Sequence, residues 1–146
     1  MTGVQTCALP ISSFSAYTAY KTNYRTENVQ VFGDAVSVGK FEVTLEFDAK
    51  NSWAKQDRLS DELLVHEQGH FDIGMLFVKE LLAKFKNAKL TKANFNSVLQ
   101  NIMTETSKKY NAMGIDYDNE TDHSKNKEQQ LKWNMFFEES LKAIYN

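Results

Sequence analysis

The sequence predicts a single α+β domain in which N-terminal antiparallel strands precede three helices. Residues Phe41 to Phe47 alternate apolar and polar side chains, which is the period of a strand with one buried face. After Asp57 the apolar residues recur every three or four positions, which is the period of amphipathic helices. A chain of 146 residues has the length of one domain. Strands followed by helices in such a chain favour the α+β class.

The composition is that of a folded globular protein, with 42% hydrophobic and 25% charged residues. The net charge of -2 and the scattered lysines and arginines give no basic patch, so we expect no nucleic-acid partner. No apolar run approaches the roughly 20 residues that cross a bilayer, so no membrane span is expected in the visible chain.

The N-terminal stretch Thr2 to Ile11, TGVQTCALPI, equals the translation of a common sequencing adapter. We therefore predict that residues 1–11 are not native and that residues 12–146 form a single, N-terminally truncated domain. On this hypothesis the lone cysteine, Cys7, indicates nothing about the redox compartment. A signal peptide would have been lost with the native N-terminus, so its absence does not argue for the cytoplasm.

The strand region is expected between Phe14 and Trp53, with turn signals at Gly33-Asp34 and at Gly39. Its clearest piece is the Phe41 to Phe47 strand, which ends at Asp48.

Three helices are expected after this region. The first spans about Ser60 to Lys86, with Ser60 as its N-cap. The second spans Lys92 to Met113 and is predicted to end at Gly114, followed by a polar loop from Tyr117 to Asp122. The third spans about Ser124 to Ile144.

The first helix carries the motif HEQGH, in which His66 and His70 lie one turn apart on the same face and could bind one zinc ion. Glu67 lies about 100° around the helix, outside the ligand set but near the water that zinc would activate. An unligated carboxylate in that place can act as a general base. Gly69 costs about 1 kcal/mol relative to alanine inside a helix, which a close approach of backbone or substrate would explain. The structural alternative is a pair of histidines whose hydrogen bonds are satisfied in the core.

A catalytic zinc site needs a third protein ligand and leaves one position to water. A close third histidine is excluded, because the position six after the second histidine is Leu76. The chain offers one other histidine, His123, and we predict it as the third ligand. The carboxylates Asp118, Glu120 and Asp122 remain alternatives.

An oxyanion formed during hydrolysis needs a hydrogen-bond donor. Tyr117 could fill this role, as could Tyr110, and either could instead be a packing residue.

Several of these residues together resemble the DUF922 family, secreted bacterial proteins of unknown function that are thought to be zinc-dependent proteases. The resemblance runs over most of Phe41 to Asn134 and rests on four motifs: Ser52-Trp53, HEQGHFDI (His66 to Ile73), the YDxETxH pattern (Tyr117 to His123), and Gln130 with Trp133-Asn134. Ser124 departs from it, since glycine is expected after the histidine. The resemblance implies a minimal zincin-like fold with His66, His70 and His123 as zinc ligands and Glu67 as the base. It also implies a secreted, periplasmic or cell-envelope location.

The sequence therefore predicts a zinc-dependent hydrolase, a metallopeptidase that cleaves peptide or amide bonds of a peptide or protein, with peptidoglycan peptides as a possible substrate. The alternative hypothesis is a non-catalytic zinc-binding interaction module of the cell envelope.

Overall fold

A long β-hairpin is the main strand feature of the computed structural model, which describes residues 14–145. Strands β2 (Tyr20–Phe32) and β3 (Ala35–Phe47) pair antiparallel along their length, and β5 (Leu90–Thr91) pairs with the start of β3. A second, two-stranded sheet joins β1 (Ala16–Tyr17) to β4 (Trp53–Ala54). Residues 1–11, which we predicted to be non-native, lie outside the described part of the chain.

Three helices follow the strands, so the predicted α+β class is confirmed. A short 3-10 turn, η1 (Gln56–Arg58), leads into α1 (Asp61–Asn87). Helix α2 (Phe95–Thr121) and helix α3 (Lys127–Tyr145) complete the chain. Among the residues that the structure describes, no helix combines the length and apolar character needed to cross a bilayer.

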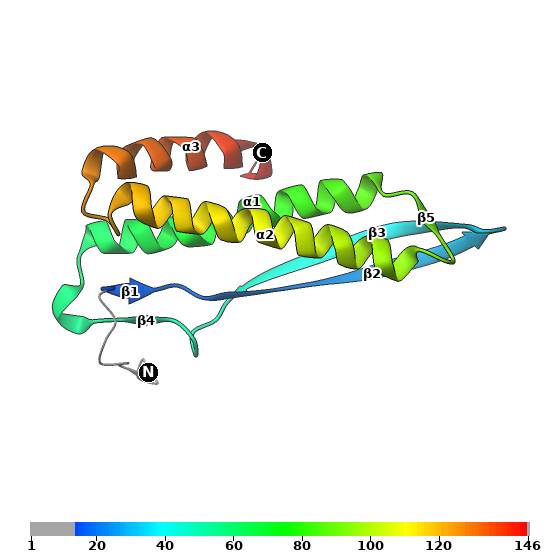
Figure 1. The fold of residues 1–146 in the computed structure, drawn as a ribbon, viewed down its shortest axis with the longest axis horizontal. Helices are drawn as coiled ribbons and strands as arrows, with labels where there is room; N and C mark the ends of the chain where they lie inside the picture. The colour runs from blue at the N-terminus through cyan, green and yellow to red at the C-terminus, as the bar shows by residue number, and fades with distance from the viewer. Residues whose placement is uncertain (1–13, 146) are drawn as a thin grey trace.

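Helix α1 is the centre of the arrangement, because it contacts α2, α3 and β3. Figure 1 shows α1 and α2 side by side above the hairpin, with α3 on the opposite side of this helical layer from the strands. The two-stranded sheet of β1 and β4 lies under the N-terminal half of α1, away from the tip of the hairpin (Figure 1). The layer of α1 and α2 therefore packs against the strands on one side and against α3 on the other.

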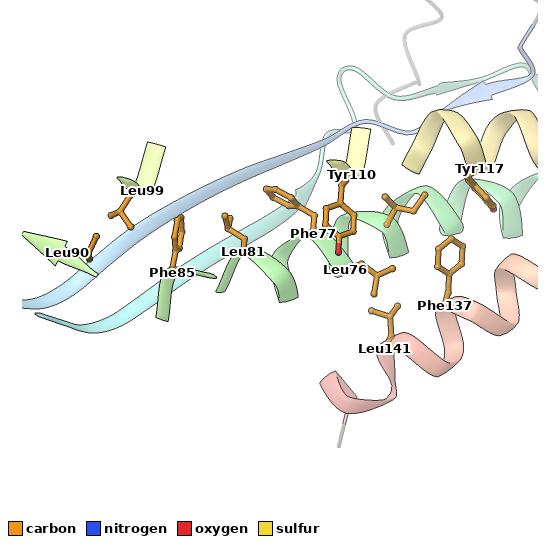
Figure 2. Close-up of a cluster of buried hydrophobic side chains, with 11 residues drawn as sticks. Leu76, Phe77, Leu81, Phe85, Leu90, Leu99, Tyr110, Tyr117, Phe137 and Leu141 are labelled. Atoms are coloured by element: carbon orange, nitrogen blue, oxygen red, sulfur yellow. The ribbon is translucent and has the colours of Figure 1, made fainter. Parts of the chain in front are cut away.

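The apolar stripe of α1 forms the middle of the core, since Ile73, Phe77, Leu81 and Phe85 recur at helical spacing and are each at most 3% exposed. In Figure 2, Phe85 lies near Leu90 and Leu99 at one end of the cluster, and Leu76 lies near Leu141 of α3 toward the other end. The remaining members of the cluster come from α1, β5, α2 and α3: Leu76, Leu90, Leu99, Tyr110, Tyr117, Phe137 and Leu141.

The predicted end of α2 at Met113 is wrong, because the helix passes through Gly114 and continues to Thr121. The predicted polar loop from Tyr117 to Asp122 is therefore helical except for its last residue. The buried residues Thr106, Tyr110, Tyr117 and Thr121 lie on one stripe of the helix that packs into the protein. Their burial outweighs the roughly 1 kcal/mol that glycine costs in a helix.

The turn between α2 and α3 uses left-handed backbone, with φ angles of 45° at Asp122, 50° at His123 and 80° at Ser124. These residues cannot be helical, so α3 begins at Lys127 and not at Ser124. Ser124, where the family resemblance predicts glycine, therefore occupies a position whose backbone is in the left-handed region that favours glycine.

The expected turn at Gly39 is also corrected, since this residue lies inside β3. A Cβ at Gly39 would come within 2.8 Å of the Asn28 Cβ on the neighbouring strand, so close approach explains the glycine. The turn expected at Gly33 is present, with a φ of 62° between β2 and β3.

A cluster of polar groups joins α1 to α2 on the surface around Glu80. This carboxylate lies 2.8 Å from Lys84 Nζ, contacts Lys109, and accepts a hydrogen bond of 2.8 Å from the hydroxyl of Tyr110. Burial raises the pKa of Glu80, but the hydrogen bonds from these three groups outweigh it and lower the pKa to about 2.

Replacing Glu80 with glutamine should lower the free energy of unfolding by about 1 kcal/mol at neutral pH. Because the native pKa lies below the ordinary value of 4.5, the carboxylate stabilises the fold above that value and loses this effect as the pH falls toward 2. Urea denaturation should show the difference between wild type and Glu80→Gln shrinking from about pH 7 to about pH 3. A constant difference over that range would contradict the assignment.

Candidate metal centre

Three side chains of types that can bind a metal meet where α1 packs against the C-terminal part of α2. His66 and His70 point from one face of α1, and Asp118 reaches them from α2. The Asp118 Oδ1 atom lies 3.1 Å from His66 Nε2 and 2.9 Å from His70 Nε2. One donor atom from each of the three residues lies within 4.8 Å of the other two.

The donor set fits a divalent metal such as zinc. Tetrahedral zinc with ligand bonds of about 2.0 Å places its donors about 3.3 Å apart, close to the spacing seen around Asp118 Oδ1. Burial raises the pKa of the Asp118 carboxyl, but the contacts with His66 and His70 hold that pKa well below its usual range. Asp118 is therefore a carboxylate, the form that binds metal, and the group His66, His70 and Asp118 could hold a metal ion.

Buried hydrogen bonds fix the orientation and tautomer of His66, which is 2% exposed. The Gln130 amide nitrogen donates to Tyr117 Oη at 2.7 Å and to Asn134 Oδ1 at 2.8 Å, so its oxygen is the atom that faces His66 Nδ1 at 3.0 Å. Since this oxygen can only accept, the Nδ1 atom of His66 carries the proton. Nε2 is then the atom that faces Asp118 Oδ1 and that would bind a metal, and a hydrogen bond to the other ring nitrogen is typical of ligand histidines.

Tyr117 packs against the metal group, as we call His66, His70 and Asp118, and does not face solvent. It is fully buried, its ring stacks on His66 with centroids 4.6 Å apart, and its hydroxyl donates to the His66 carbonyl oxygen at 2.9 Å. Burial raises the pKa of this hydroxyl, so the proton needed for that bond is retained. With its proton committed, Tyr117 is not placed to donate to an oxyanion, and the geometry favours the packing role.

Tyr110 is also not part of the centre, because its hydroxyl is bonded to Glu80 in the surface cluster.

The glycine in HEQGH is explained by Tyr117. A Cβ at Gly69 would come within 2.2 Å of Tyr117 Oη and 3.0 Å of a Phe137 ring atom. The close approach predicted from the sequence is thus made by a side chain and not by backbone or substrate. Without a Cβ at this position, α1 can pack directly on the hydroxyl that bonds its own His66 carbonyl.

Glu67 lies on a different face of α1 from the two histidines and is not part of the metal group. Its Oε2 atom accepts a hydrogen bond of 2.5 Å from the hydroxyl of Thr18, which follows β1. The side chain borders a cleft of about 470 Å³ between α1 and the small sheet of β1 and β4. Glu67 therefore has a fixed position beside open space, as an unligated carboxylate would need.

His123 lies next to the metal group. Its Nδ1 atom is 3.6 Å from the same Asp118 oxygen that faces the other two histidines, and Phe14 packs on its ring with centroids 4.6 Å apart. The structure thus brings the alternative ligand Asp118 into the group and leaves His123, the predicted third ligand, at its border.

The other two carboxylates considered as ligands do not belong to the metal group found among the described residues. Glu120 accepts a hydrogen bond of 2.8 Å from Trp133 Nε1, and Asp122 is the left-handed C-cap of α2.

Sequence reasoning missed two residues that contact the site. The Thr18 hydroxyl bonds Glu67 across 49 positions of the sequence, and no local pattern signals this contact. Thr121 places its hydroxyl 3.4 Å from His66 Nδ1, and its position four residues after Tyr117 would have signalled it had the helix been predicted to continue.

The fold and the site together define an α+β protein with a group of three side chains that could hold a metal ion. Residues 10–124 match the family described as "Bacterial protein of unknown function (DUF922)", so the chain belongs to this bacterial family. The match includes the metal group and His123, whereas Gln130 lies beyond it. Comparisons with curated proteins and with solved structures found no match.

Two glycines that face the site should respond in opposite directions to alanine. Gly69→Ala should lower the free energy of unfolding by about 2–3 kcal/mol, because the new methyl group overlaps Tyr117. Gly114→Ala should raise it by about 0.5–1 kcal/mol, since the nearest atom to its Cβ is His70 Nδ1 at 4.0 Å and alanine favours the helix. Urea denaturation measures both, and equal effects would contradict this packing.

The third ligand can be identified from zinc affinity. Asp118→Asn should weaken zinc binding by about 100-fold and His123→Ala by less than about tenfold, because Asp118 alone of the two contacts both helix histidines. Competition against a chromophoric chelator gives the affinities, and circular dichroism checks that both variants fold. A larger loss in His123→Ala would restore His123 as the ligand.

Proposed function

We propose that this protein is a zinc-dependent hydrolase, most simply a metallopeptidase. The observation that carries the proposal is that α1 presents both candidate metal ligands and a separate, unligated carboxylate. Two imidazoles converge with a carboxylate on a common point, while Glu67 lies outside that group against an open cleft. A structural zinc site is closed by four protein ligands, whereas a catalytic site has three protein ligands and a neighbouring base.

The proposed ligands are His66 and His70, with Asp118 or His123 as the third. Zinc bound there would supply Lewis-acid polarisation of a carbonyl and would lower the pKa of water to about 7. Orientation of the ligands and proton transfer would be carried out by side chains of the protein. Gln130 holds the Nδ1 proton of His66, so the Nε2 lone pair stays directed into the site.

Glu67 is the proposed general base and then the general acid. Its carboxylate takes a proton from the attacking water and later gives it to the leaving amine as the C–N bond breaks. Thr18 donates to one carboxylate oxygen, Oε2, and so orients the side chain while the other oxygen remains available for proton transfer.

The proposed setting is the cell envelope or the exterior of a bacterial cell, where the substrate would be a peptide, a protein or a peptidoglycan peptide. The resemblance to secreted bacterial proteins and the membership of a bacterial family support this setting. Casein and purified peptidoglycan are the two substrates whose parallel assay separates proteolysis from cell-wall cleavage.

The variant Glu67→Gln should retain stoichiometric zinc and lose hydrolysis by about three orders of magnitude or more, because the proton acceptor is removed and the ligands are not. His66→Ala should lose both zinc and hydrolysis. Metal analysis and peptide cleavage followed by mass spectrometry measure the two properties. Unchanged hydrolysis in Glu67→Gln would refute the mechanism, and stoichiometric zinc without cleavage of a broad peptide library would favour the zinc-binding interaction module.

A further inference from the structure

The cleft beside Glu67 is bordered mainly by apolar side chains from three parts of the chain. Tyr17 comes from β1, Trp53 from β4 and Phe71 from α1, and Phe47 and Leu64 lie at its edge. Tyr17, Phe47 and Leu64 are 54%, 58% and 69% exposed, although each could bury a large apolar surface. Large, solvent-exposed apolar side chains that cluster around a cleft indicate a binding site for an apolar group.

The volume of the cleft and the charge of its bordering residues further limit the kind of side chain that it can bind. The volume of about 470 Å³ lies within the range of pockets that enclose small ligands, so an aromatic or long aliphatic side chain would fit. Glu67 is the one charged residue among the described residues that border the cleft, and its carboxylate disfavours acidic groups there. The cleft thus suits a large uncharged side chain.

A second groove on α1 is a weaker candidate for the same role. It lies between α1 and α3, has a volume of about 670 Å³, and is bordered by the charged residues Asp72, Glu138 and Lys142. Glu67 does not border it. A substrate that reaches the proposed base must therefore lie on the strand side of α1, where Thr18 holds Glu67 at the cleft.

We infer that the cleft between α1 and the β1–β4 sheet binds a large apolar side chain of a peptide substrate, and directs cleavage to bonds beside aromatic or long aliphatic residues. This inference rests on the proposed peptidase function for the cleavage step, but the binding step does not need catalysis. The site would prefer phenylalanine or leucine over alanine, and alanine over glutamate.

Binding can be tested by fluorescence, because Trp53 borders the cleft and Trp133 is the other tryptophan of the chain. In zinc-loaded protein of full length carrying Glu67→Gln and Trp133→Phe, Trp53 is the sole indole and turnover is blocked. The probes are the blocked peptides Ala-Ala-Phe-Ala, Ala-Ala-Ala-Ala and Ala-Ala-Glu-Ala, and because Glu67→Gln removes the carboxylate, the glutamate peptide serves here as a polar control. The phenylalanine peptide should bind at least about tenfold more tightly than the alanine peptide, as burial of one aromatic side chain predicts.

Two matched variants locate the binding. Ala49 and Ala93 are exposed alanines in turns, and Ala49 borders the cleft whereas Ala93 lies in the turn before α2. Ala49→Phe should narrow the cleft and remove most of the preference for the phenylalanine peptide, while Ala93→Phe should leave it unchanged. Equal binding of the three peptides, or a preference that survives Ala49→Phe, would overturn the inference. A dimer that Ala49→Phe dissociates, without any peptide signal, would assign the cleft to a second copy of the chain and also overturn it.

Cleavage sites provide the second readout, with wild-type protein and a peptide library analysed by mass spectrometry. Cuts concentrated beside large apolar residues would support the inference, and cuts without that preference would overturn it while leaving the peptidase proposal intact. Selective binding of the phenylalanine peptide with no cleavage of any library member would support the cleft as a binding site and refute the peptidase function.

Discussion

The bond from the Tyr117 hydroxyl to the His66 carbonyl is the contact on which the candidate site depends. It ties α2 to α1 at the residue whose imidazole faces Asp118, and Gln130 of α3 bonds both Tyr117 and the same imidazole. The three helices therefore meet at one buried network, and among the described residues no buried side-chain nitrogen or oxygen lacks a hydrogen-bond partner. Gly69 makes this possible, because any larger residue there would push the hydroxyl away from the carbonyl. Loss of this contact would loosen the helix packing and the ligand orientation together.

Helix geometry explains why one short motif can serve two sides of α1. Residues four apart share a face, so His66 and His70 both point at α2, while the next residue after His66 is turned by about 100° toward the strands. The small sheet of β1 and β4 covers that second side, and it brings Thr18 to Glu67 from far earlier in the chain. Glu67 is thus offset from the metal group by about 100° around the helix, and the cleft forms on the side of Glu67.

Local sequence patterns predicted the elements whose signals lie within a few residues, and failed where distant packing decides. The N-cap at Ser60 is present, with its side chain accepting from the Leu63 amide, and the Phe41 to Phe47 alternation lies inside β3 as expected. The sequence predicts a helix end at Gly114, because a local pattern does not include neighbours in space, yet Tyr117 is buried against α1 and the helix continues to Thr121. The HEQGH ligand pair follows from spacing alone, whereas the place of Asp118 follows only once α2 is known to continue. Thr18 has no local signal, since its role comes from strand pairing with β4.

The extension of α2 also bears on which residue completes the metal group. Asp118 lies within regular helix, directly after the buried Tyr117, so its carboxylate is held in place before any metal binds. His123 lies on three consecutive left-handed residues, a backbone that non-glycine residues adopt at a cost of about 1 kcal/mol or more each. That cost is sustained only where surrounding contacts hold the turn, and here Phe14 packs on the His123 ring while its Nδ1 atom faces Asp118. The turn therefore keeps a third imidazole, beside those of His66 and His70, directed at the same Asp118 oxygen. Such a position suits a residue that helps to orient the Asp118 carboxylate.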